Sequence, residues 1–167
     1  MRTIVVVVTL ASSLAAAAAA AQTPASEKTA SAWKCAAANP THAVPVADQA
    51  NHAYVVSSSQ CTALKGEIAG IAEKSGVATE FTEVMGDMAK GHGIFVETLA
   101  NGDKVTVSYE FTGTMKNQQF QSGGNKWTVT GGTGKFKGAK GQGTCTAKGN
   151  PDGSLNFDCT GTYTLAQ

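Results

Sequence analysis

Residues 103–115 read DKVTVSYEFTGTM, and this stretch decides the fold class. Its residues alternate strictly: one face holds Val105, Val107, Tyr109, Phe111 and Met115, and the other holds Thr, Ser and Glu. A period of two with one apolar face is typical of a half-buried β-strand. Asn101-Gly102 separates this strand from GIFVETLA, and Asn-Gly between two such runs indicates a hairpin. Residues 93–99 and 103–115 are therefore predicted to pair antiparallel.

A second hairpin is predicted at the end of the chain. Residues 154–165, SLNFDCTGTYTL, repeat the alternation, and NPDG at 150–153 supplies turn chemistry through its proline and glycine. A hairpin centred on Asp152 places Cys145 opposite Cys159, close enough for a disulfide. Of the three ways to pair four cysteines, this predicts Cys145–Cys159 and leaves Cys35–Cys61.

The remaining chain extends the β pattern from residue 53 onward. Further strands are predicted at 53–64, 66–73, 77–90, 125–130 and 141–148, which makes eight strands and no strong helix pattern. Many short strands separated by glycine-rich turns favour a sandwich or a closed barrel. The outward positions are mostly Thr, Ser, Glu, Asn and Lys, unlike the apolar outside of a membrane barrel. An antiparallel barrel of eight strands fits best, and it has room for packed side chains or one small ligand.

The first 52 residues are assigned to two other segments. Arg2, the apolar run 4–10 and the alanines at 15–21 resemble a removable secretory signal over residues 1–21, too short to span a bilayer. Residues 22–52 are predicted to form a mobile leader and an extended segment, and residues 53–167 form the barrel domain. Export to a periplasm or out of the cell agrees with disulfides. No membrane span is expected after removal of the signal.

Composition excludes several classes of function. Residues 22–167 carry twelve lysines and twelve acidic residues, and the only arginine, Arg2, lies in the predicted signal. Nucleic-acid and phosphate sites usually use arginine, so neither partner is expected. The cysteine spacing lacks a C-x₂-C pair, and no zinc or other metal site is predicted. Phosphate-loop and dinucleotide fingerprints fail at Val129 and Lys137, so no cofactor is predicted.

The densest glycine run provides a resemblance. TGGTGKFKGAKGQGT, residues 130–144, is similar to the signature of the allene oxide cyclase and dirigent-like barrel superfamily, including small exported bacterial members of unassigned function. The resemblance implies an eight-stranded antiparallel barrel with an apolar interior, often a homo-oligomer. Plant members of that group cyclise a fatty-acid epoxide or steer the coupling of phenoxy radicals. Gly131, Gly132 and Gly134 are expected to supply positive φ, and Gly141 and Gly143 a tight strand crossing or a bulge.

Candidate site residues follow from the predicted barrel. Its ligand-binding residues would be aromatic residues on the apolar faces, namely Tyr109, Phe111, Trp127 and Phe157. The catalytic residues stay unknown, with Glu97 as the weak candidate. Glu97 shares a face with Phe95 and Leu99, while Ile94 and Val96 make the opposite face apolar too, and the surface orientation is favoured. Glu110 is predicted to point outward, and His42, His52 and His92 to be solvated loop residues.

Three functions remain open at this stage. The first is binding of a small apolar or aromatic molecule inside the barrel. The second is a lyase or isomerase that acts on an apolar substrate in the same cavity. The third is a structural or partner-binding secreted protein with a filled barrel. An interior cavity would favour the first two, and a carboxylate inside it would favour the enzyme over the carrier.

Overall fold

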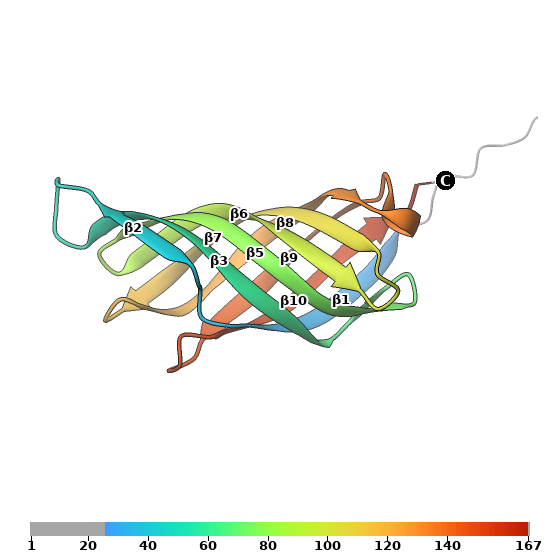
Figure 1. The fold of residues 1–167 in the computed structure, drawn as a ribbon, viewed down its shortest axis with the longest axis horizontal. Helices are drawn as coiled ribbons and strands as arrows, with labels where there is room; N and C mark the ends of the chain where they lie inside the picture. Colours follow the sequence, from blue (N-terminus) through green and yellow to red (C-terminus); the bar gives the residue numbers. More distant parts are fainter. Residues whose placement is uncertain (1–25, 167) are drawn as a thin grey trace, which may run out of the picture.

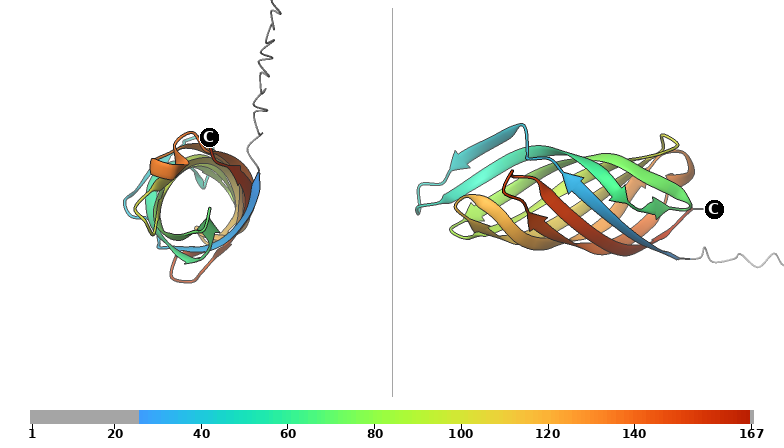
Figure 2. Two further views of the ribbon diagram at one scale, coloured as in Figure 1. Left: turned by 90° about the vertical axis from the view of Figure 1, so that its right-hand side faces the viewer. Right: turned by 90° about the horizontal axis from the view of Figure 1, so that it is seen from below.

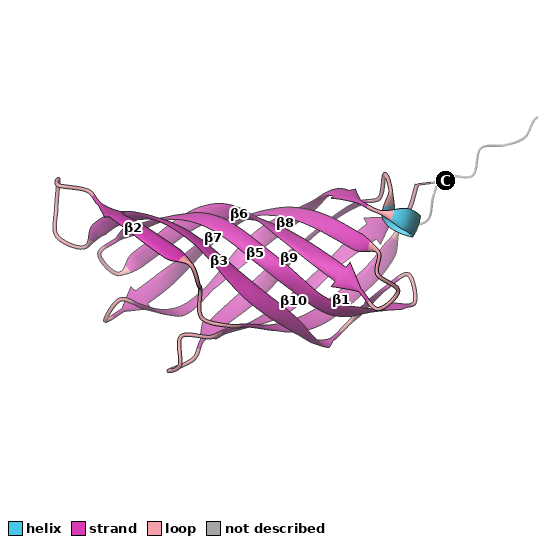
Figure 3. Ribbon diagram, viewed as in Figure 1, coloured by secondary structure: helices cyan, strands magenta, loops and turns pink. Residues whose placement is uncertain are grey.

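The computed structural model describes residues 26–166, which are almost entirely β-strand (Figure 3). The predicted signal at residues 1–21 lies outside them. In the described part, no helix is long and apolar enough to cross a bilayer. The elements are β1 (Glu27–Cys35), β2 (Thr41–Pro45), β3 (His52–Lys65), β4 (Glu67–Ile68), β5 (Ile71–Met85), β6 (Met88–Leu99), β7 (Lys104–Lys116), β8 (Gln119–Gly132), the 3₁₀ turn η1 (Gly134–Phe136), β9 (Lys140–Gly149) and β10 (Leu155–Thr164).

Eight of the ten strands form a closed antiparallel barrel (Figure 1). From β5 to β10 each strand pairs with its neighbour in the sequence, and β3 pairs with β5. The N-terminal strand β1 closes the ring because it pairs with β10 on one side and β3 on the other (Figure 2). The short strands β2 and β4 lie outside the ring, on β3 and β5. The predicted fold class is confirmed.

Both predicted hairpins are confirmed. β6 and β7 pair around the Asn101-Gly102 turn, with Gly102 at φ 88°. β9 and β10 pair with Cys145 opposite Cys159. Both predicted disulfides are present, Cys145–Cys159 and Cys35–Cys61, and all four cysteines are paired.

The predicted domain boundary at residue 53 is wrong. β1, which lies in the segment 22–52 predicted to be a mobile leader and an extended segment, is a full barrel strand and pairs with β10 over nine residues. Its small and polar residues hide the alternation that marks the other strands, although Trp33 and Cys35 are buried. The predicted strand 66–73 is instead the short strand β4, a turn and the start of β5. The predicted strand 77–90 is interrupted by the β5–β6 turn at Gly86. The count of eight is therefore correct, but β1 replaces the segment 66–73.

Glycines in the barrel wall make room for aromatic rings. The ring of Trp127 lies over Gly143 and Gly161, which are paired with each other on the next two strands. A Cβ atom at either glycine would collide with the indole. Gly143 therefore lets the Trp127 ring pack closely against β9, whereas the sequence predicted a strand crossing or a bulge there. Of the three glycines expected to have positive φ, only Gly134 does, at 51°.

A hydrophobic core fills one end of the barrel. Phe136 of η1 packs there against strand residues and is 1% exposed. The other buried members of this cluster are Ile68, Leu99, Val105, Val129, Ala139 and Tyr163. The core closes the end that carries η1, so the interior opens toward the opposite end.

Candidate ligand-binding cavity

The barrel encloses a cavity of about 1030 Å³. It extends from the core around Phe136 to the turns at the opposite end, where Asn51, Asp87 and Asn117 line it. Its walls are the inward faces of all eight barrel strands. The volume is at the upper end of the range of small-molecule sites, so side chains alone do not fill the middle of the barrel.

All four aromatic residues expected to bind a ligand lie on the cavity wall. Tyr109 and Phe111 come from β7, Trp127 from β8 and Phe157 from β10. The structure adds Trp33, Phe95 and Phe120 to this wall. Trp33 and Phe95 meet edge to face with ring centroids 5.0 Å apart. Sequence reasoning missed Trp33 because residues 22–52 were placed outside the barrel domain.

Glu97 points into the barrel, which corrects the expected surface orientation. Its side chain lines the cavity and is 4% exposed. Phe95 and Leu99 share its inward face, while Ile94 is exposed on the outside. Burial raises the pKa of Glu97 to about 9, and the charge of Glu73 adds to this effect. Glu97 therefore favours the neutral carboxylic acid form at pH 7.

Glu73 is a second interior acid that sequence reasoning missed. It belongs to β5 and lines the cavity, and burial raises its pKa to about 7 while the Ser31 hydroxyl acts in the opposite direction. Trp33 of β1 donates from Nε1 to Ser31 Oγ over 3.1 Å. The closing strand thus brings an indole and a hydroxyl beside the carboxyl of Glu73.

A third acid, Glu80, lies between Ser57 and Tyr109. Tyr109 donates from its hydroxyl to Glu80 Oε2 over 2.9 Å. The tyrosine crosses β6 at Gly93, where a Cβ atom would lie 2.6 Å from the tyrosine hydroxyl oxygen. Burial raises the pKa of Glu80, opposed by its bonds to Tyr109 and Ser57. Burial likewise raises the pKa of Tyr109, so the tyrosine stays a hydrogen-bond donor.

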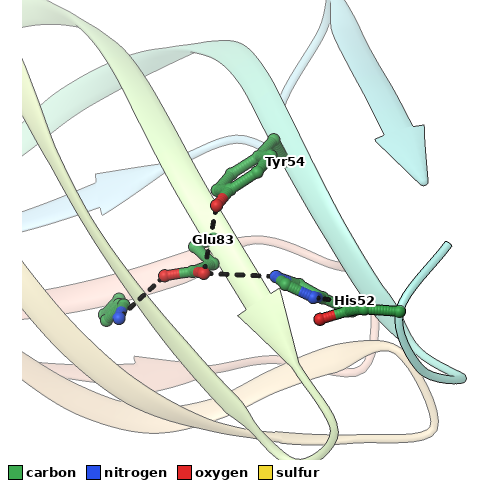
Figure 4. A network of polar contacts seen from close by, with 5 residues as sticks. His52, Tyr54 and Glu83 are labelled. Carbon is green, nitrogen blue, oxygen red and sulfur yellow. Dashed lines mark hydrogen bonds and ion pairs between the residues drawn. The ribbon is translucent and has the colours of Figure 1, made fainter. Parts of the chain in front are cut away.

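The acidic side chains of Glu83 and Glu110 point away from the cavity. Glu110 is exposed on β7, as predicted. Glu83 belongs to a polar network with Tyr54 and His52 (Figure 4) and is not among the residues that line the cavity. Its carboxylate accepts from Tyr54 and pairs with Lys90 at 2.8 Å, and the bond to Lys90 lowers the pKa of Glu83.

His52 contradicts the expectation of a solvated loop histidine. It lies in β3, is 8% exposed, and contacts Asp48 at 2.7 Å and Glu83 at 3.1 Å. The bond to Asp48 is the main cause that raises the pKa of His52. His42 and His92 are exposed, but both lie on strands, β2 and β6. In residues 26–166 no three His, Cys, Asp or Glu side chains are grouped so that they could hold a metal ion.

Comparison with known proteins gives a fold. No protein-family model matches the chain, and no curated protein matches its sequence. One pterocarpan synthase dirigent protein superposes with a TM-score of 0.50 and 11% identity, covering 87% of this chain and 99% of that one. A second superposes at 0.49 and 12%, covering 87% and 94%. A conserved protein of unknown function from Rhodopseudomonas palustris superposes at 0.47 and 9%, covering 84% and 99%.

The strand order and the superposition at a TM-score of 0.50 agree with the resemblance found in residues 130–144. The chain therefore has the dirigent and allene oxide cyclase-like barrel fold.

Proposed function

We propose that this protein is an exported barrel that binds a small apolar or aromatic molecule in its interior. The observation that carries the proposal is the cavity of about 1030 Å³ with aromatic residues from at least five strands in its wall. A fold whose solved relatives include pterocarpan synthase dirigent proteins supports interior binding. Two complete disulfides support export, because such bonds persist in oxidising compartments.

Tryptophan fluorescence tests this proposal directly. The two tryptophans of the sequence, Trp33 and Trp127, both line the cavity. A bound aromatic molecule is expected to change their emission saturably when a panel of phenolic and aliphatic compounds is titrated. Phe111→Ala, inside the barrel, should weaken this binding, and Phe81→Ala, on the outer face, should leave it unchanged. Absence of a saturable response across the panel would overturn the proposal.

A lyase or isomerase reaction is the second candidate. The observation that favours it is the presence of Glu97 and Glu73 in the cavity, with pKa values of about 9 and 7. Such a pair can supply a proton and accept one near neutral pH. Recovery of every bound compound unchanged after long incubation would speak for binding without reaction. A filled structural barrel, the third alternative, disagrees with the cavity.

A further inference from the structure

The cavity carries hydrogen-bond acceptors that have no partner. Within residues 26–166, three buried side-chain oxygens lack one: Glu73 Oε2, Glu97 Oε1 and Asn125 Oδ1. All three residues line the cavity. A buried polar atom without a partner costs free energy, which a ligand that donates hydrogen bonds would recover.

The charged groups of the wall are acidic in the part of the chain that the structure describes. Glu73, Glu80 and Glu97 lie inside, and Asp87 lies at the mouth, but neither lysine nor arginine is among the lining residues. The other titratable groups on the wall are Tyr109 of β7, Tyr163 of β10 and His52 near the mouth; β8 and β9 contribute none. A carboxylate ligand would find no lysine or arginine to pair with in the interior, which disfavours a fatty-acid anion.

Aromatic rings adjoin the two acids. Phe95 precedes Glu97 by two residues on β6 and lies on the same inward face, where its ring covers Gly76. Trp33 contacts both sides of this section: its ring meets Phe95, and its Nε1 donates to Ser31 beside Glu73. Aromatic faces next to carboxylates are the surroundings that an ammonium ion prefers.

We propose that the cavity selects hydrophobic amines in their ammonium form, with Glu97 and Glu73 bonding the nitrogen and Trp33 and Phe95 packing around it. This rests on the proposed binding function and narrows its ligand class. An ammonium donates its N–H hydrogen bonds most strongly to ionised carboxylates. On binding, the neutral acid of Glu97 therefore loses its proton to solvent and becomes a carboxylate. The N–H groups then supply the donors that Glu97 Oε1 and Glu73 Oε2 lack.

A matched series of probes tests the charge preference. 3-Phenylpropylamine, 3-phenylpropanol and 3-phenylpropanoate share one aromatic tail and differ in the head group. Calorimetric titration at pH 7.5 is expected to give the amine at least about tenfold tighter binding than the alcohol, with the carboxylate weakest. Amine affinity should rise from pH 6 to 9, because binding releases the proton of Glu97. The amine itself does not limit this rise, since an alkylammonium stays charged to about pH 10.

Variants separate this inference from the proposed function. Glu97→Gln should remove most of the preference for amine over alcohol while alcohol binding persists, which also shows that the variant is folded. Glu110→Gln, on the outer face, should keep the preference. Equal or tighter binding of the alcohol, or an amine preference that survives Glu97→Gln, would overturn the amine selection alone. Failure of both amine and alcohol to bind counts against it, and if the wider panel also fails, against the binding function as well.

Discussion

The orientation of a single residue, Glu97, determines the chemistry of the interior. Alternation within 93–99 cannot assign its side because Ile94 and Val96 are as apolar as Phe95 and Leu99. The neighbouring strand could have resolved this. The Asn-Gly hairpin pairs Glu97 with Val105, whose inward side is evident from 103–115, and directly paired residues share a face. The register of the β6–β7 hairpin therefore gives the orientation of Glu97, which the alternation within 93–99 does not.

Glu97 should make stability depend on pH. Its pKa is raised from 4.5 to about 9 in the folded protein, so the unfolded chain releases the proton first as pH rises. The free energy of unfolding should therefore fall between pH 4.5 and 9, by at most about 1.4 kcal/mol per pH unit from this group. Glu97→Gln should flatten the profile in urea denaturation measured across that range. If Glu97→Gln leaves the slope of stability against pH unchanged, Glu97 is already ionised in the folded protein over this range.

The glycines under Trp127 offer a second test at the residue scale. Gly143→Ala would place a Cβ atom against the indole and the carbonyl oxygen of Thr160. Expected results are a loss of about 1–3 kcal/mol in stability and a shifted tryptophan emission. Gly131→Ala is the matched control, since its Cβ would meet nothing closer than 4.0 Å. Equal effects of the two substitutions would contradict the close approach of Trp127.

At the scale of elements, strands with strong alternation were predictable and β1 was not. β7 and β10 show their inward faces through large apolar residues, whereas β1 has Thr29 and Ser31 at inward positions ahead of Trp33. Burial of β1 comes from the barrel closing around it, which no local pattern encodes. Because β1 is not recognisable as a barrel strand from its sequence, Trp33 and Ser31 are not predictable as cavity residues either.

The Cys35–Cys61 disulfide holds this closing strand to β3. Replacing both cysteines with serine should cost about 3 kcal/mol and expose the amides of β1 to hydrogen exchange. The pair Cys145→Ser and Cys159→Ser should cost a similar amount, but the protection lost should lie in the β9–β10 hairpin. Uniform loss of protection in both variants would contradict this local assignment.

The outer surface of the whole molecule is less polar than the sequence suggested. Apolar side chains on neighbouring strands β2, β3, β5 and β6 form one exposed patch. Among them, Val56 is 48% exposed, Phe81 40% and Ile94 42%. Alternation in 53–64 and 77–90 is too irregular to separate inside from outside, so this patch was not foreseen. Exposed apolar patches of this kind mark contact surfaces.

Self-association through this patch is the expected consequence. Sedimentation velocity should show a concentration-dependent oligomer of the wild-type chain, and Phe81→Ser with Ile94→Ser should shift it to monomer. Thr144→Ala with Thr146→Ala alters the exposed face of β9, outside the patch, and should leave the oligomer intact. A wild-type chain that stays monomeric at high concentration would contradict this role.

The closure of the ring by β1 also imposes an order on folding. Its partner β10 lies at the other end of the chain, and Glu27 and Tyr163, which meet there, are 136 residues apart. Hairpins from β5 to β10 can form locally as the chain emerges, but β1 must wait for β10 before it can close the ring. Closing so long a loop is entropically costly and slows folding. Any fragment that stops before β10 leaves two open sheet edges, so the interior exists only once β10 has been made.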